Sequence, residues 1–199
     1  MNDDKPAPAR PRAPRKDTKQ ELLQAAARVI LRDGVPGLTL DAVATEAGLS
    51  KGGLIYHYAT KDALIGAMLD QLVDVTDSQV AAYRASDDTP GSWVRGYLKA
   101  CMLAERDESG TQSRLEMAIL AACLNEPALL RRLHKHMREW AAASANDGID
   151  PELAHVVRLA ADGLWMNDVF GLPVLEPEER ARVLRKLEAL TRLGGSAPE

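Results

Sequence analysis

The stretch GLSKGGLIYHYATK, from Gly48 to Lys61, decides the fold class of the N-terminal part of this chain. It contains no acidic side chain, although the 199-residue chain carries a formal net charge of −4. It follows a short amphipathic segment, TLDAVATEA (39–47). A glycine at a turn, a serine that can cap the next helix, and Lys, Tyr and His donors beyond it are the pattern of a helix-turn-helix that enters a DNA groove.

Three short helices are predicted in this region. Thr18 and Glu21 have the capping-box spacing and begin a first helix that ends at Gly34. A second helix begins after Thr39 and ends at the Gly48 turn, and a third begins after Ser50 and runs to about Tyr56. The two helices joined by the Gly48 turn should cross most closely near Ala44, four residues before Gly48, where a small side chain is needed.

The third helix contains two adjacent glycines, Gly52 and Gly53. Together they should cost about 2 kcal/mol of helix propensity relative to alanine. The cost is understandable if the backbone must approach a partner very closely, since a bare Cα leaves room for phosphates and base edges. The alternative is a loose helix at a tolerant position.

The segment from about Thr18 to Leu64 resembles the DNA-binding domain of the tetracycline-repressor-like (TetR) transcriptional regulators. The motif is carried by Thr39, Val43, Ala44, Ala47, Gly48, Ser50, Lys51, Gly52, Leu54, Tyr56, Tyr58, Lys61 and Leu64. The sequence departs from the family pattern at Gly53, Ile55 and His57, which are positions that help to set operator preference, so no operator can be transferred.

The resemblance implies which residues meet double-stranded DNA. Most of the contacts would be to phosphates, with Lys51, Gly53 and His57 as the plausible base readers. Leu54 and Tyr58 would instead hold the recognition helix against its neighbours. The predicted DNA-binding residues are Thr39, Ser50, Lys51, Gly52, Gly53, Tyr56, His57 and Lys61.

The composition favours an all-α fold. Hydrophobic residues make up 46% and aromatic residues 4% of the chain, and Ala and Leu, which are good helix formers, dominate the apolar content. We expect a flexible basic arm at residues 1–16, a helix-turn-helix domain at 17–62 and a helical effector-binding and dimerisation domain at 63–199. The proline-rich arm is either a solvated tail or a segment whose arginines reach along the DNA.

Charge and cysteine content restrict where the protein works. Residues 1–61 carry ten Lys or Arg against seven Asp or Glu, so the first segment is positive and the remainder acidic. Cys101 and Cys123 lie in apolar helical contexts without CxxC spacing and are expected to be core residues. With no apolar run of the roughly 20 residues that a membrane helix needs, and no signal peptide, a soluble cytoplasmic protein is expected.

The remaining chain predicts about six further helices, giving about nine in all. The first of them is a long amphipathic helix from Asp62 to Arg84 that would join the DNA-reading head to the body, and a break follows at 87–90. A polar loop is predicted at 106–113. The other helices are expected at 93–102, 115–124, 127–146, 151–170 and 178–193.

Soft and aromatic side chains in the body are candidates for a small-molecule site. Each of them taken singly can be ordinary core, but together with a few polar groups they could line a cavity for a largely apolar ligand. The candidates are Trp93, Tyr97, Met102, Glu116, Met117, Leu120, Met137, Trp140, Trp165, Met166 and Phe170.

These patterns predict a DNA-binding transcriptional regulator, a repressor released by a small effector. In the family the last two helices form the interface of a homodimer, which also suits two half-sites one DNA turn apart. The alternatives are a helical interaction module that does not read DNA, and a DNA-binding protein without a small-molecule effector. No catalytic motif, cofactor fingerprint or metal-ligand spacing appears; His134 and His136 are two apart and point away from one another on a helix. No enzyme, cofactor or metal site is therefore predicted.

Overall fold

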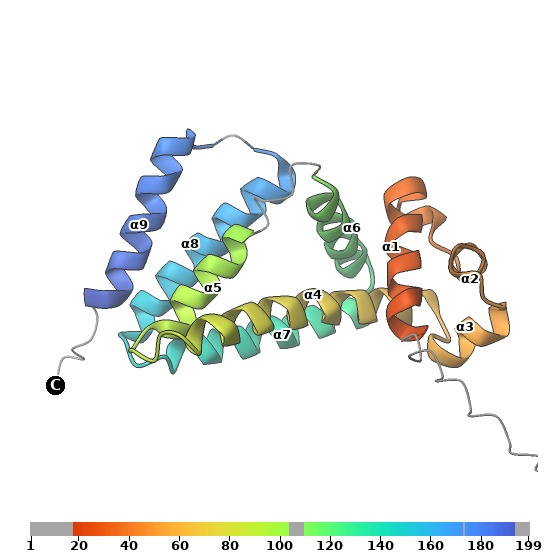
Figure 1. The fold of residues 1–199 in the computed structure, drawn as a ribbon, viewed down its shortest axis with the longest axis horizontal. Coiled ribbons are helices and arrows are strands. Elements are labelled where there is room, and N and C mark those ends of the chain that lie inside the picture. The colour runs from red at the N-terminus through yellow and green to blue at the C-terminus, as the bar shows by residue number, and fades with distance from the viewer. Residues whose placement is uncertain (1–17, 104–109, 173, 194–199) are drawn as a thin grey trace, which may run out of the picture.

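The computed structural model of this chain describes residues 18–103, 110–172 and 174–193. These residues form nine α-helices and no strand, which confirms the all-helical prediction. The predictions for the N-terminal arm and for residues 106–109 lie outside the described residues. Figure 1 shows the helices of residues 18–57 at one end of the molecule, the head, and the other helices extending away from them as the body.

The head consists of α1 (Thr18–Gly37), α2 (Leu40–Ala47) and α3 (Lys51–His57). The helical conformation of α1 is interrupted at Gly34, which has φ 72° and ψ 176°, so the predicted end of the regular helix is confirmed. The predicted caps are also present, because Thr39 accepts from the Ala42 amide and Ser50 from the Gly53 amide.

The body begins with α4 (Lys61–Arg84), which runs along most of the molecule and is capped by Thr60. None of the described helices is long and apolar enough to cross a bilayer. The polar loop that was predicted to reach Ser113 is wrong at its end, since helical structure starts at Thr111, directly after Gly110 in the left-handed conformation. The other body helices are α5 (Ser92–Leu103), α6 (Thr111–Asn125), α7 (Pro127–Ala145), α8 (Pro151–Phe170) and α9 (Pro177–Leu193).

Two hydrophobic cores hold the described residues together. The first joins the head to the first half of α4 and continues into α6 and the start of α7, where Ile119, Cys123 and Leu129 are buried with Leu54 and Leu64. The second core lies between α5, α8, α9 and the ends of α4 and α7. The head therefore shares its core with body helices, across the boundary at residue 62 that the sequence predicts.

The two cysteines belong to these cores. Cys101 lies in the second core and Cys123 in the first, both buried, and neither forms a disulfide. Their prediction as small core residues is confirmed.

Candidate nucleic-acid interface and ligand cavity

The turn between α2 and α3 depends on Gly48. This residue has φ 67° and ψ 29°, a left-handed conformation that side chains other than glycine rarely adopt, and its amide donates to the carbonyl oxygens of Ala44 and Thr45. Ala44 itself is 4% exposed, as expected for a small residue near a helix crossing. The turn sets α3 on the outer side of the head (Figure 1).

One face of α3 is buried and the other is open. Leu54 is 0% and Tyr58 9% exposed, so both hold the helix against the head core, as predicted. Tyr56, in contrast, is 86% exposed, which is unusual for a tyrosine within a helix. The His57 ring lies edge-on to the Tyr56 ring, with 5.1 Å between the centroids. The open face thus presents an aromatic hydroxyl and an imidazole to whatever meets α3.

The glycine pair of α3 has two different environments. A Cβ at Gly52 would meet no heavy atom within 4 Å, whereas one at Gly53 would lie 3.3 Å from the capping hydroxyl of Ser50. Gly53 is therefore in contact with the cap of its own helix. At Gly52, nothing in the described part of the chain requires the absence of a side chain.

The lysines of the predicted interface have partners within the protein. The exposed Lys51 ammonium lies 2.9 Å from the Asp41 carboxylate on α2. The Lys61 ammonium donates to the Val35 carbonyl oxygen at 2.6 Å, at the end of α1, and does not project freely outward as expected. Lys61 thus has a structural contact in addition to its predicted role on DNA.

Two arginines of α1 attach α2 to it. Arg28 and Arg32 donate to the two oxygens of Glu46, at 2.7 and 2.8 Å, and hold the pKa of that carboxyl below its ordinary value. These guanidinium groups therefore connect α1 to α2 and help to position the helix-turn-helix.

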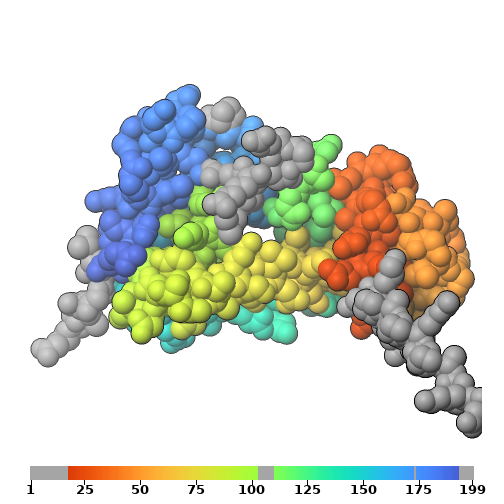
Figure 2. Space-filling view, in the orientation of Figure 1, coloured from red at the N-terminus to blue at the C-terminus, as the bar shows by residue number. Residues whose placement is uncertain are grey.

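A large cavity of the described chain lies between the two cores. It has a volume of about 500 Å³ and is enclosed by α4, α5, α6, α7 and α8. Figure 2 shows the surface hollowed between α5 and α6, above α4. The lining residues are Leu69, Leu72, Val73, Val75, Thr76, Gln79, Tyr97, Ala100, Cys101, Gln112, Glu116, Leu120, Leu133, Met137, Trp140, Asp162, Trp165 and Met166.

Two carboxylates in this cavity have different surroundings. Asp162 accepts a hydrogen bond from the Tyr97 hydroxyl at 2.6 Å and pairs with Arg158 at 2.8 Å. Glu116 accepts from the Gln112 amide at 2.8 Å and from the Trp165 indole at 3.2 Å. Burial raises the pKa of Glu116, and it also raises the pKa of the Cys101 thiol to about 12 and that of Tyr97 above its usual range.

Comparison with known proteins assigns the chain to a family. Residues 22–68 match the family model described as "Bacterial regulatory proteins, tetR family", and residues 91–192, half of the chain, match "Tetracyclin repressor-like, C-terminal domain". The chain belongs to the TetR family. It is accordingly a DNA-binding transcriptional regulator, which confirms the resemblance seen in the sequence.

Among the curated relatives of this TetR-family chain is the HTH-type transcriptional regulator BetI of Stenotrophomonas maltophilia. It is 31% identical over 160 residues, which are 75% of this chain and 80% of BetI. A second is the HTH-type transcriptional regulator RutR of Escherichia coli, 30% identical over 103 residues, 52% of this chain and 48% of RutR. Both are described as regulators of transcription.

Solved structures share the fold over most of this chain. A transcriptional regulator from Rhodococcus sp. superposes with a TM-score of 0.69 at 20% identity, covering 90% of this chain and 99% of the other. The multidrug binding protein EbrR, solved with malachite green, superposes with a TM-score of 0.65 at 27% identity, covering 90% and 98%.

Seven of the eleven side chains predicted for a ligand site line the cavity of this TetR-family chain. Trp93 stacks on Tyr97 from behind, Met117 is half-buried on α6, and Phe170 is 55% exposed on α8. The sequence did not indicate that α4 and Asp162 also line the cavity. Helical periodicity predicts which face of a helix is buried, but not which other helix packs against it. The seven that line it are Tyr97, Glu116, Leu120, Met137, Trp140, Trp165 and Met166.

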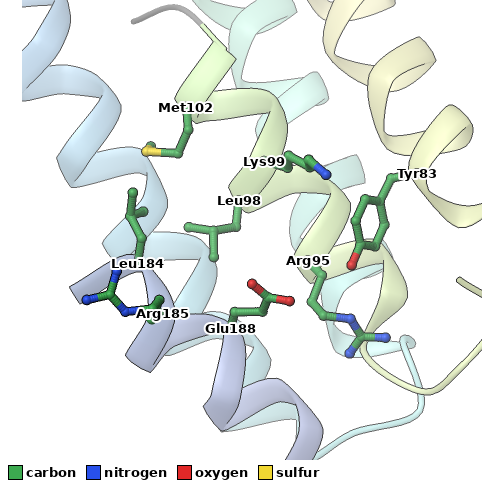
Figure 3. A pocket seen from close by; sticks show the side chains of 8 residues that line it. All are labelled: Tyr83, Arg95, Leu98, Lys99, Met102, Leu184, Arg185 and Glu188. Carbon is green, nitrogen blue, oxygen red and sulfur yellow. The ribbon is translucent and has the colours of Figure 1, made fainter. Parts of the chain in front are cut away.

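Met102, the remaining candidate, lines a smaller hollow of about 210 Å³ between α5 and α9. Figure 3 shows Met102, Leu98 and Leu184 at one end of it and Tyr83 with Arg95 at the other. The Lys99 ammonium lies 5.3 Å from the centre of the Tyr83 ring. This second hollow does not include any other side chain that the sequence predicted for ligand binding.

Proposed function

We propose that this chain is a homodimeric repressor that leaves its operator when a small, largely apolar effector occupies the 500 Å³ cavity. One observation carries the proposal: α6 lines that cavity and also packs into the head core. Gln112, Glu116 and Leu120 line the cavity, while Ile119 and Cys123 are buried against the head. A ligand that displaces α6 must therefore disturb the packing that positions α1.

The DNA side of the proposal rests on the open face of α3. We assign operator contact to Thr39, Ser50, Lys51, Gly52, Gly53, Tyr56, His57 and Lys61. The exposed Tyr56 and the empty space at Gly52 support this assignment, since both are costly for a helix that meets only water. On binding, the Lys51 ammonium would exchange its partner Asp41 for a phosphate of the DNA backbone.

A twofold interface is supported by an apolar stripe on α8. Val156, Leu159, Met166 and Phe170 are between 49% and 58% exposed and recur at helical spacing on one face. Gly163 lies in the same row, and a Cβ there would meet no atom within 4 Å, so a second helix can approach closely. We propose that this stripe, together with α9, forms the homodimer interface.

The two assignments give a mechanism of release. An effector that binds better to a body conformation with α4 and α6 displaced would separate the two recognition helices from the spacing of one DNA turn. A coupling of about 2–3 kcal/mol between the cavity and the operator site corresponds to a roughly 30- to 150-fold loss of operator affinity. EbrR, which has a similar fold and was solved in complex with malachite green, supports a small-molecule effector for this chain.

The proposal contains no enzymatic step and no cofactor. A regulator that reads chromosomal DNA acts in the cytoplasm, which is the location we propose. The alternative is an interaction module whose head does not read DNA; it predicts that substitution on the open face of α3 changes no DNA affinity.

The decisive experiment measures binding of the full-length protein to DNA from its own upstream region and from random sequence across a salt series. Lys51→Met should weaken binding and reduce the slope of log affinity against log salt by about 1, as expected for one lost phosphate contact. Lys135→Met is the charge-matched control, because Lys135 is exposed on α7, outside the head and outside the proposed dimer interface.

Tyr56→Ala should also weaken operator binding without loss of thermal stability, since the side chain has little to pack against. Equal affinity of the native protein for upstream and random DNA would lead to selection of binding sites from random DNA. Failure to select any preferred sequence there would overturn the repressor proposal in favour of the module that does not read DNA.

A further inference from the structure

The charged residues in the described wall of the 500 Å³ cavity are all acidic. Its described lining residues include two carboxylates, Asp162 and Glu116, but no lysine, arginine or histidine. Arg158 neutralises Asp162 at 2.8 Å, and the Tyr97 hydroxyl occupies the other oxygen. Of the two described carboxylates, Glu116 is the one whose hydrogen-bond partners, the Gln112 amide and the Trp165 indole, are both neutral.

A carboxylate in this position carries an electrostatic cost that a ligand can remove. Taking a charged carboxylate out of water is unfavourable unless it is paired, and burial accordingly raises the pKa of Glu116. Among the described residues, no cationic group contributes to this pKa shift of Glu116. A positively charged ligand would supply the missing partner, whereas an anion would be repelled and a neutral ligand would leave the cost in place.

The rest of the wall has the chemistry that accommodates organic cations. Tyr97, Trp140 and Trp165 contribute aromatic rings, and Met137 and Met166 contribute polarizable thioethers. Tyr97 and Trp140 meet edge-to-face with centroids 5.2 Å apart, and Trp93 stacks behind Tyr97, so the ring cluster is held in place by its own packing.

We propose that the effector is a monocation with an aromatic or branched apolar body, whose positive centre pairs with the Glu116 carboxylate beside Trp165. The inference rests on the proposed effector role of the cavity, and it adds the charge of the ligand and the residue that selects it. Glu116 is on α6, so the same contact that recognises the cation acts on the helix that reaches the head core.

The test compares two probes of one shape: benzyltrimethylammonium and neopentylbenzene, in which a carbon replaces the charged nitrogen. Binding to the full-length protein is followed by tryptophan fluorescence, because Trp140 and Trp165 line the cavity. The native protein should bind the cation at least about tenfold more tightly than the neutral isostere, which is the scale of one charge-assisted contact in a partly buried site.

Three variants identify the residue. Glu116→Gln, which keeps the size and an acceptor oxygen, should abolish the preference for the cation, and Glu116→Asp, which keeps the charge, should retain it. Glu178→Gln, an exposed carboxylate on α9, removes the same net charge outside the cavity and should change neither affinity. Circular dichroism melts of each variant check that the fold is intact.

The pH dependence of cation affinity distinguishes an ionic contact with Glu116 from a purely steric role of this residue. Because the cation binds the ionised form of Glu116, its affinity in the native protein should rise with pH until the carboxyl is fully deprotonated and then level off. The Glu116→Gln protein should show no such rise, and neither should the neutral probe.

The inference is overturned if neopentylbenzene binds as tightly as the cation, if neither probe binds, or if Glu116→Gln leaves the preference unchanged. The proposed repressor function is tested separately, by measuring operator binding. A neutral probe that releases the operator would uphold an effector-controlled repressor while overturning the cationic class, whereas loss of any sequence preference on DNA would overturn the repressor itself.

Discussion

Position 52 lies in a helix on the surface, and nothing in the described part of the molecule occupies the space that a side chain would fill. Folding alone would favour alanine here, because glycine costs about 1 kcal/mol in a helix. A residue that lowers stability and meets nothing within its own chain is best explained by a partner that comes close. The glycine at position 52 therefore supports the assignment of α3 to DNA.

Gly52→Ala should therefore separate stability from function. We expect a variant that is more stable, by up to about 1 kcal/mol, yet binds the operator more weakly, because a methyl group stands between the backbone and the DNA. Urea unfolding and fluorescence anisotropy on operator DNA measure the two effects. Unchanged operator affinity would show that no close approach occurs at this position.

A second residue-scale feature is the burial of Arg95 beside Asp87. The guanidinium is 1% exposed, donates to Asp87 at 2.9 Å and to Thr89 and Thr191, and so connects α5 to the preceding loop and to α9. Arg95, followed by Thr89, holds the pKa of the Asp87 carboxyl far below its ordinary value of 3.8. Removal of this carboxylate would leave a buried cation without its partner.

Asp87→Asn should lower the free energy of unfolding at neutral pH. Since the folded-state pKa is depressed, the stabilisation is fully present above about pH 4 and is lost as the pH falls from 3.8 toward the folded value, so the native and variant curves should converge in acid. Asp88→Asn, its exposed neighbour, is the control and should change little at any pH. A constant gap between Asp87→Asn and native protein down to pH 2 would contradict this assignment.

At the scale of elements, α6 is the helix that connects the two proposed sites. One side of it borders the cavity, and the other carries Ile119 and Cys123, 1% and 0% exposed, into the core shared with the head. The reactivity of the two cysteines can be used to follow both sides of α6. Cys101 borders the cavity, and Cys123 lies between α6 and the head.

Thiol labelling follows directly from this placement. At pH 8 both cysteines should react with iodoacetamide far more slowly than a free thiol, and the rate at Cys101 should rise about tenfold per pH unit toward its pKa of about 12, as long as the fold persists. An effector should slow the reaction at Cys101 and speed it at Cys123 if it moves α6 away from the head. Mass spectrometry locates each label; rapid labelling of Cys123 without effector would mean that α6 is not packed on the head in solution.

At the scale of the whole molecule, the outward side of α8 is the clearest unpaired surface of the described chain. Four large apolar side chains are exposed along it, and a protein of this size rarely exposes such a continuous row without covering it. In the homodimer that we propose, a second copy would cover this surface with matching chemistry and would set the two α3 helices at a fixed distance.

Leu159→Asp should shift the protein from dimer to monomer, because each dimer would bury two carboxylates close to the twofold axis. We expect operator affinity to fall strongly as well, since one head can occupy only one half-site. Sedimentation equilibrium gives the mass and anisotropy gives the affinity. Ala189→Asp places the same charge at an exposed position of α9, so the masses of the two variants can be compared between α8 and α9. A dimer that persists in Leu159→Asp would exclude the α8 stripe as the interface.

The helical class, the helix-turn-helix with its caps at Thr39, Ser50 and Thr60, and the breaks at Gly34, Gly48 and 87–90 could all be predicted from the sequence, because they depend on local backbone and capping chemistry. Other features depend on how the helices pack against one another. Periodicity showed that α8 has two apolar faces, but only the packed fold shows which is buried and which is exposed. It also shows that Lys61 meets Val35 and that α4 and Asp162 help to enclose the cavity, since such contacts arise between residues far apart in the chain.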